Sequence, residues 1–317
     1  MSNLKAEDCK EKRKRRNEFL EMIGPYRQDL FLFCRKLTNN PWDAEDLVQE
    51  TLMKADMRLG DTHFGIDNLK SYLFKMASNQ WIDWCRRSRV MVSIDVVPEE
   101  PIFMNPQFEI KDALSSLIYY LPPKERVAII LKDVFDFKLD EIKNVMETTQ
   151  GAVKSALHRG REKMEMVKKK TALNIEPKVN QEHRDVVDKA VDFFNKRDID
   201  GFCSLLLENA TGNAYGCFLE SSAEEIKKGS VFYTINKPDG TPQPKEMRAE
   251  CIELYGENLF VLWNEDKLDD VWRIHVEDGK ISRFDCYYCC PKVLEEIAEL
   301  VGVKSNYHGY YYEEVVS

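Results

Sequence analysis

The chain has 317 residues, 43% hydrophobic and 32% charged, which is typical of two or three small globular domains and excludes a disordered chain. No stretch approaches the roughly 18 apolar residues of a membrane span, and the basic residues near the N-terminus lead into no apolar signal core. The nine cysteines are odd in number and scattered, unlike the framework of a secreted disulfide scaffold. We therefore expect a cytoplasmic protein with reduced thiols.

The net charge of −9 is unevenly distributed along the chain. Residues 1–180 contain 31 Lys and Arg against 28 Asp and Glu, whereas residues 181–317 contain 15 against 27. Within the first part, basic residues cluster at 12–16, 86–89 and 154–170. Clustered bases are typical of a phosphate-binding surface, although each cluster is equally compatible with a solvated helix face.

Three helices are predicted in the first 90 residues. Apolar residues recur at three- and four-residue steps over residues 18–37, which indicates an amphipathic helix. Asn40-Pro41 ends this helix and begins the next, because proline suits the first turn of a helix and not its interior. A polar loop, residues 60–68, separates the second helix from a third over 69–89. We expect the three to form one bundle.

A linker and a second helical region follow. Residues 90–108 lose the helical periodicity and contain three prolines, which indicates a domain boundary. The helical pattern resumes at Leu114 and leads to two short helices, one over 139–146 and one over 153–161 with Thr149 as its N-cap. This spacing predicts a helix-turn-helix whose second helix enters the major groove of DNA.

Beyond the lysines at 168–170 the pattern changes to that of an α+β domain. Helices are predicted at about 181–196 and 199–207, before segments that alternate as strands do. The expected strands and closing helix cover residues 247–254, 259–263, 271–276, 281–288 and 291–300, with a hairpin turn at Asp278-Gly279. The helices should cover one face of a curved antiparallel sheet.

The string Asp43-Ala44-Glu45-Asp46-Leu47-Val48-Gln49-Glu50 resembles the core-binding helix of the extracytoplasmic-function (ECF) sigma factors of the sigma-70 family. The resemblance implies docking on the clamp coiled coil of the largest subunit of RNA polymerase. In this interpretation Leu47 and Val48 supply apolar contact, while the acidic and amide groups pair with basic residues. The implied core-binding residues are Asp43, Asp46, Leu47, Gln49 and Glu50.

The segment from Asn68-Leu69-Lys70-Ser71-Tyr72-Leu73 to Arg86-Arg87 resembles the promoter-melting helix of the same family. The resemblance implies that Asn79 and the loop at 60–68 read the minus-ten element. Its implied DNA-binding residues are Tyr72, Lys75, Asn79, Asp83, Arg86 and Arg87. Trp81 and Trp84 are more typical of a helix core than of base stacking, and for Tyr72 and Trp81 both interpretations stay open.

The third motif, Thr149-Gln150-Gly151-Ala152-Val153-Lys154-Ser155-Ala156-Leu157-His158-Arg159-Gly160-Arg161-Glu162-Lys163, resembles the family's minus-thirty-five recognition helix. The resemblance implies that Lys154 and Arg159 approach bases, while other polar residues contact phosphates. The implied DNA-binding residues are Thr149, Lys154, Ser155, His158, Arg159 and Arg161. Relatives usually carry Arg where this chain has Ala156, which removes one phosphate or shape contact.

The resemblance gives a multidomain fold class of two all-α sigma domains followed by a cone-shaped α+β domain. Residues 15–90 correspond to sigma region 2, 91–108 to the linker and 109–172 to the helix-turn-helix of region 4. Residues 180–317 resemble the SnoaL-like domains fused to some of these factors, on motifs at 193–201 and 277–291. Such domains enclose a pocket, so a small ligand is one expected partner.

Few residues of the C-terminal part suggest chemistry. Asp266, His275 and Asp285 are candidate proton-transfer groups, but each is more typical of a surface or hydrogen-bonded strand position. The Cys286, Cys289 and Cys290 cluster could bind metal or respond to oxidation, yet it lacks a second Cys/His pair, so core thiols are favoured. The aromatic tail at 307–315 could dock on another domain or close the cone. We expect no catalytic residues, metal or cofactor.

Three motifs in order predict a sigma factor, with RNA polymerase core and promoter DNA as partners and no membrane contact. The acidic C-terminal domain is expected to contact the sigma domains and regulate them in cis. Two alternatives remain: a helix-turn-helix regulator that never joins polymerase, and a SnoaL-like enzyme fused to a DNA-targeting module.

Overall fold

The computed structural model describes residues 2–38, 40–60, 68–90, 121–168, 181–215, 217–306 and 308–309. These residues belong to two compact units, Met1–Ile175 and Glu176–Ser317, here called unit 1 and unit 2. The predictions for the minus-ten loop, for the linker with the first helix of region 4, and for most of the aromatic tail lie outside the described residues. Within the described part, no helix has the length and apolar character needed to cross a membrane.

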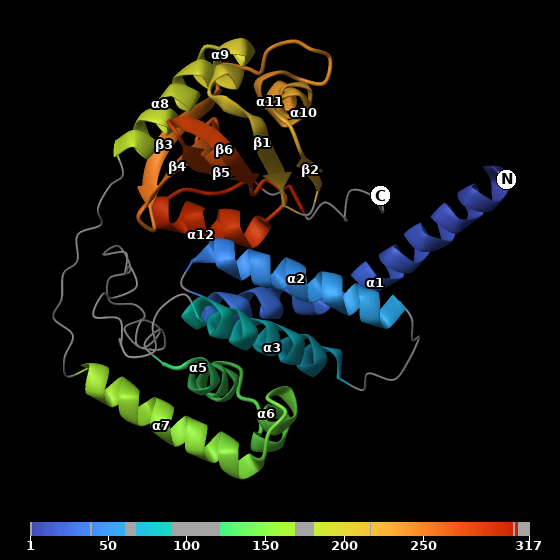
Figure 1. The fold of residues 1–317 in the computed structure, drawn as a ribbon, viewed down its shortest axis with the longest axis vertical. Helices are drawn as coiled ribbons and strands as arrows, with labels where there is room; N and C mark the ends of the chain where they lie inside the picture. The colour runs from blue at the N-terminus through green and yellow to red at the C-terminus, as the bar shows by residue number, and fades with distance from the viewer. Residues whose placement is uncertain are drawn as a thin grey trace. The chain divides into compact units, whose positions relative to one another are not determined.

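Unit 1 is entirely helical in its described part (Figure 1). Its elements are α1 (Ser2–Leu37), α2 (Pro41–Gly60), α3 (Leu69–Val90), α5 (Pro123–Ile129), a π-helical turn η1 (Ile130–Val134), α6 (Leu139–Val145) and α7 (Gln150–Lys168). The predicted break at Asn40-Pro41 is confirmed, since the Asn40 side-chain oxygen accepts a hydrogen bond from the Asp43 backbone N–H at 2.8 Å.

Helices α1, α2 and α3 pack around a core that contains one buried ion pair. Phe33 of α1 and Phe74 of α3 stack with their ring centroids 4.5 Å apart. Arg27 donates to Glu45 across the interface between α1 and α2 at 2.7 Å, and both side chains are buried. A buried charge requires such a partner, so this pair fixes how α1 and α2 meet.

An aromatic cluster of Phe33, Phe74, Phe135 and Phe137 joins the first three helices to the helix-turn-helix part of unit 1. Phe135 meets Phe33 and Phe74 edge-on at 5.9 and 5.0 Å, and Phe137 stacks on Phe74 at 5.6 Å. Arg126 of α5 reinforces the contact by donating to the Leu37 carbonyl at 2.7 Å. The two helical regions therefore pack together within unit 1, while the boundaries expected from sequence stay predictions.

Unit 2 has the α+β fold predicted for it (Figure 1). Its helices are α8 (Gln181–Asn195), α9 (Ile199–Ser204), α10 (Ala223–Lys228), α11 (Ser230–Ile235) and α12 (Pro291–Val301). Its strands are β1 (Leu206–Ala214), β2 (Phe218–Glu220), β3 (Met247–Leu254), β4 (Glu257–Asn264), β5 (Lys267–Glu277) and β6 (Lys280–Cys286).

The strands form one six-stranded sheet in the order β2-β1-β6-β5-β4-β3. All neighbours are antiparallel except β1 and β6, which pair in parallel with Ala214 opposite Cys286. The predicted hairpin turn between β5 and β6 is confirmed, since Asp278 and Gly279 both have positive φ, at 51° and 68°. The parallel pair requires a long crossover, which the intervening helices and strands provide.

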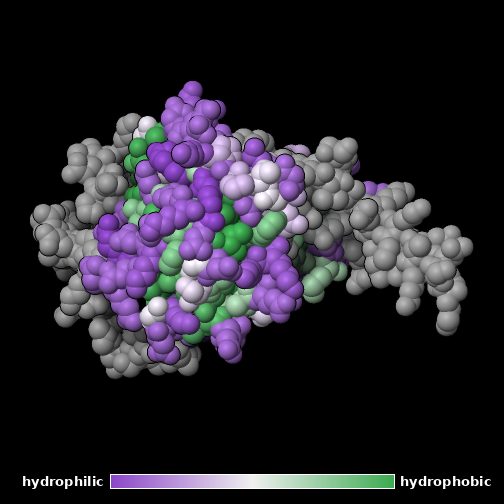
Figure 2. Space-filling view, turned by 90° about the horizontal axis from the view of Figure 1, so that it is seen from above, coloured by the Kyte–Doolittle hydropathy of each residue, from purple (hydrophilic) through white to green (hydrophobic). Residues whose placement is uncertain are grey.

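The inner face of the sheet carries the core of unit 2, including Phe260, Trp272 and Phe284, against which α8 places Phe194. Around this core the outer surface is mainly polar, with hydrophobic residues between polar ones on the face that Figure 2 shows. One prediction was wrong: the helix expected over 199–207 ends at Ser204, and Leu206 already begins β1. Leu205 to Leu207 form an apolar run too short to distinguish helix from strand, and pairing with β6 decides the outcome.

Candidate nucleic-acid interface

A helix-turn-helix is formed by α6, a four-residue turn and α7. The Glu141 carboxylate accepts from the Lys138 backbone N–H at 2.7 Å and starts α6. Glu147, with φ of +48°, reverses the chain after α6. The predicted N-cap is confirmed, because the Thr149 hydroxyl accepts from the Ala152 N–H at 3.2 Å and so begins α7.

Helix α7 buries one face and leaves a polar face exposed. Val153, Ala156, Leu157 and Met164 are buried against the rest of unit 1. The residues predicted to contact DNA that lie on the exposed side are Lys154, Ser155, His158, Arg159 and Arg161. Ala156, where the resemblance implies Arg, is a buried position in this chain. An arginine there would not reach DNA without disturbing the helix packing.

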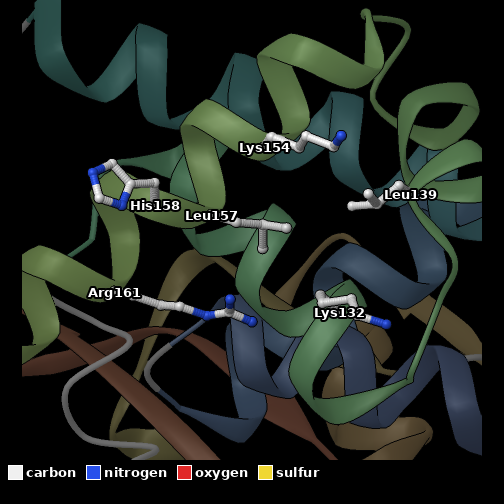
Figure 3. A pocket seen from close by; sticks show the side chains of 6 residues that line it. All are labelled: Lys132, Leu139, Lys154, Leu157, His158 and Arg161. Atoms are coloured by element: carbon white, nitrogen blue, oxygen red, sulfur yellow. The ribbon is translucent and has the colours of Figure 1, made fainter.

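Four basic side chains line a pocket of about 370 Å³ beside the exposed face of α7. Lys154, His158 and Arg161 come from α7, and Lys132 comes from η1. Figure 3 shows Lys132 and Leu139 across the pocket from the α7 side chains. The sequence did not identify Lys132 as part of this surface, because it lies outside the recognition motif. Basic side chains clustered at a helix face provide favourable contacts for phosphate oxygens.

Arg159 takes part in holding α7 in place. Its Nε donates to the Glu125 carboxylate of α5 at 2.9 Å, and Lys163 donates to the other oxygen at 2.9 Å. Burial raises the pKa of Glu125, but the hydrogen bonds from Lys163 and Arg159 outweigh burial, so its pKa is lowered from the ordinary value. Arg161 likewise donates to Asp133, at 2.6 Å. These ion pairs tie α7 to α5 and η1.

Two residues of α3 predicted to contact promoter DNA contact the turn of the helix-turn-helix instead. Lys75 pairs with Glu147 at 2.7 Å, and the Asn79 amide donates to the same carboxylate at 3.2 Å. The hydrogen bonds from Lys75 and Asn79 lower the pKa of Glu147. In this arrangement the Glu147 carboxylate is bonded to Lys75 and Asn79, the two side chains that the resemblance assigns to the minus-ten element of promoter DNA.

The other α3 residues are distributed between core and surface. Trp81 is buried, with the Arg126 guanidinium 5.3 Å from its ring centroid, and thus packs as a core residue. Trp84, expected in the core, is 42% exposed. Arg86 donates to Asp83 at 2.8 Å on the surface. The remaining predicted residues are Tyr72, which is half-buried, and Arg87, which is exposed.

The predicted polymerase-binding string lies on α2. Asp46 and Glu50 are exposed, whereas Leu47 is only 6% exposed and Val48 is fully buried inside unit 1. Helical periodicity explains the difference, since residues 47 and 48 point about 100° and 200° away from residue 46. Of the others, Asp43 accepts from the Asn40 amide at 2.9 Å and Gln49 donates to Glu45 at 2.7 Å.

The exposed face of α2 continues from the acidic residues into two methionines. Met53 is 64% exposed and Met57 is 69% exposed. With Asp46 and Glu50 they follow the spacing of one helix face, which we call the acidic-methionine face. The sequence analysis missed the methionines, although continuing the helical spacing from Asp46 would have found them.

Comparisons with known proteins agree with this arrangement of helices. Residues 22–90 match the model of sigma-70 region 2, and residues 111–164 match that of sigma-70 region 4. These two stretches of unit 1 are therefore similar to regions 2 and 4 of the sigma-70 family. Unit 2 has the α+β fold described above.

The chain is similar to several ECF sigma factors. The chain is 26% identical over 226 residues to the ECF RNA polymerase sigma factor SigG of Mycobacterium tuberculosis, in a match covering 62% of this chain and 61% of SigG. It is 29% identical over 150 residues to SigM of Bacillus subtilis, covering 45% of this chain and 91% of SigM. Among solved structures, the ECF sigma factor SigJ of M. tuberculosis is 17% identical with a TM-score of 0.33, covering 84% of this chain and 95% of SigJ.

In unit 2, the candidate proton-transfer residues lie at hydrogen-bonded or exposed positions. Asp285 is buried and accepts from Arg283 at 2.7 Å, with the His275 ring 3.0 Å away. Burial raises the pKa of Asp285, but hydrogen bonds from His275 and Arg283 outweigh it and lower the pKa. Asp266 is exposed in the turn between β4 and β5. The structure thus brings His275 and Asp285 together and leaves Asp266 apart.

The buried carboxylate that the sequence analysis missed is Asp270 of β5. It accepts from Trp272 Nε1 at 2.6 Å, from the Cys286 thiol at 3.0 Å and from the Val271 N–H at 2.7 Å. Burial outweighs these bonds and raises the pKa of Asp270 to about 7. Its position in an apolar strand carries no local sequence signal.

The raised pKa of Asp270 predicts pH-dependent stability. The folded state holds the proton more tightly than the unfolded chain, whose Asp pKa is near 3.8. The stabilisation is therefore fully present below that value and is lost as the pH rises through about 7, by at most about 1.4 kcal/mol per pH unit. Urea unfolding between pH 5 and 8 should show this slope, and Asp270→Asn should remove it. Asp285→Asn is the matched control and should retain the slope.

Proposed function

We propose that the chain is an ECF sigma factor, which binds RNA polymerase core and directs it to specific promoters. The observation that carries the proposal is the basic face of α7, where Lys154, His158 and Arg161 lie one helical turn apart beside Lys132. The chain spans about three-fifths of the length of SigG, and the assignment of partners to this chain rests on its own surfaces.

The basic face of α7 fits the major groove of promoter DNA. The exposed side chains on one face of a recognition helix can reach the edges of the DNA bases. The basic side chains beside them contact phosphates. We assign Lys154 to base contact and Arg161, with Lys132, to phosphate contact. Arg159 keeps the base-reading role that the resemblance implies only if it leaves Glu125 on DNA, because the two are hydrogen-bonded at 2.9 Å.

The acidic-methionine face of α2 fits the basic clamp coiled coil that the resemblance implies. Its carboxylates provide charge complementarity, and its exposed methionines provide an apolar surface that adapts to a partner helix. An exposed ion pair between Glu50 and Lys54, 2.5 Å apart, costs little to break on binding.

Polymerase binding and catalysis distinguish the proposed function from the two alternatives. A helix-turn-helix regulator outside the holoenzyme has no use for a second interface on α2. An enzyme fused to a DNA-targeting module needs several proton-transfer groups gathered in a site open to substrate. Asp270 and Asp285 are buried and hydrogen-bonded, His275 is paired with Asp285, and Asp266 lies apart in the turn between β4 and β5. We therefore assign neither catalysis nor a cofactor to the chain, and a ligand of unit 2 stays part of the proposal.

The DNA assignment is tested with single-base variants of a promoter. Lys154→Ala should lose discrimination at one position, at a cost of about 1–3 kcal/mol, because a base contact is specific. Arg161→Ala should weaken binding to all promoter variants alike and flatten the salt dependence, because a phosphate contact does not depend on the base sequence. Fluorescence anisotropy of holoenzyme on each duplex measures both. Undiminished base preference in Lys154→Ala would refute its role.

The polymerase assignment is tested by holoenzyme assembly. Met53→Ala combined with Glu50→Ala should weaken binding to core by about tenfold or more, as expected for anchor residues at an interface. Met166→Ala is the matched control, since this α7 methionine is 58% exposed and lies away from α2. Leu47→Ala is unsuitable, because losing a buried leucine destabilises the fold by about 2–5 kcal/mol. Equal affinity of the double variant and the control would remove α2 as the docking face.

Regulation in cis follows from the charge distribution. Residues 181–317 carry 12 more acidic than basic residues and are tethered to the DNA-binding part, so they compete with phosphate at high effective concentration. Transcription by residues 1–179 should therefore differ from that of the full chain, with a smaller effect of removing only residues 305–317. Equal activity of all three proteins in a promoter-dependent assay would contradict regulation by unit 2.

A further inference from the structure

Two cysteines from distant parts of unit 2 meet at one edge of the sheet. Cys217 lies in the turn between β1 and β2, and Cys289 lies in the connection from β6 to α12. Both are reduced thiols, and their Sγ atoms are 3.0 Å apart. The sequence analysis placed Cys289 among core thiols and did not pair it with Cys217.

The pairing of β1 with β6 brings the two cysteine thiols close together. β1 and β6 run in parallel with Ala214 opposite Cys286, and each cysteine lies three residues beyond its member of that pair. The register continues past the strands, since the Tyr215 N–H donates to the Cys286 carbonyl at 3.1 Å. Tyr215 also stacks on Tyr287, with centroids 4.8 Å apart. Backbone pairing and ring stacking therefore hold the two thiols together.

The geometry is compatible with a covalent bond. From 3.0 Å, the sulfurs need to approach by only about 1 Å to reach a disulfide bond length. Small side-chain adjustments can supply that movement.

We propose that Cys217 and Cys289 form a modification site at which a hydroperoxide oxidises the two thiols to a disulfide. Cys217 is half-buried and Cys289 is buried, so Cys217 is the thiol that meets the oxidant. Its thiolate attacks one peroxide oxygen, the O–O bond breaks, and the other oxygen leaves as water with the thiol proton. Cys289 then attacks the sulfenic sulfur, the S–O bond breaks, and a second water leaves. Two thiols are oxidised and one hydrogen peroxide is reduced to two waters.

The thiols of two further cysteines of unit 2 are kept protonated by burial. Burial raises the pKa of the Cys251 thiol to about 12, and burial beside Asp270 raises the pKa of Cys286 well above its ordinary value. Among the described residues, no three His, Cys, Asp or Glu side chains are grouped to hold a metal ion. The pair therefore has the geometry of a dithiol rather than of a metal site.

The disulfide would tie the β1–β2 turn to the start of α12. Cys290, the next residue, is the N-cap of α12, and its N–H donates to the Tyr287 carbonyl at 2.8 Å. Tyr288, on the other side, stacks on His308 with centroids 3.7 Å apart. Oxidation would thus restrain the corner of unit 2 on which the C-terminal segment packs.

The test treats the reduced full-length protein with hydrogen peroxide, blocks remaining thiols with iodoacetamide and maps the peptides by mass spectrometry. We expect the loss of two alkylatable thiols per chain, a peptide pair joining Cys217 to Cys289, and recovery of both thiols with dithiothreitol. Oxidation should also raise the midpoint of thermal unfolding, because the cross-link restricts the unfolded chain.

Cys217→Ser and Cys289→Ser should each abolish the joined peptide and the rise in midpoint, whereas Cys251→Ser should retain both. Circular dichroism of the reduced variants checks that they fold. The peptide map of the wild-type protein tests the disulfide even where a variant does not fold. Non-reducing electrophoresis separates this bond from one between chains. Oxidised wild-type protein in which Cys217 and Cys289 remain alkylatable, or are joined to other cysteines, would overturn the proposal.

Discussion

Each helix of unit 1 must bury one face, and this constraint decides which side chains remain for partners. On α2 the buried face takes Leu47 and Val48, which leaves Asp46, Glu50 and two methionines exposed. On α7 the buried face takes Val153 and Leu157, and the basic side chains point outward. The two proposed binding faces are therefore consequences of how the same helices close the core.

The aromatic cluster adds a second level of organisation, because it packs the helix-turn-helix part against the first three helices. In that packing Glu147 occupies Lys75 and Asn79, which the resemblance assigns to promoter DNA. The Lys75–Glu147 pair is well exposed and is worth less than about 1 kcal/mol, so phosphates can displace the carboxylate at low cost. The larger barrier to separating the two parts lies in the stacked rings and in Arg126.

The sequence predicted most of the fold, because helix caps, periodicity and turn residues act locally. Thr149, Asn40-Pro41 and Asp278-Gly279 all form the predicted local structures. Contacts between distant residues had no such signal. Asp270 is a polar residue buried by strand pairing, and Cys217 meets Cys289 through the parallel register of β1 and β6. The exposed polar face of α7 could be predicted because one helix supplies it, whereas Lys132 and the Cys217–Cys289 approach depend on tertiary packing.

The π-helical turn η1 changes the direction in which the residues that follow it point. The Phe135 N–H bonds to the Ile130 carbonyl, five residues back, so the turn holds one residue more than an α-helical turn would. One residue corresponds to about 100° of rotation around a helix axis. The extra residue therefore aims Phe135 and Phe137 at the rings of the first three helices. The winding of the backbone at η1 and the stacked rings therefore act together in packing the two helical parts of unit 1.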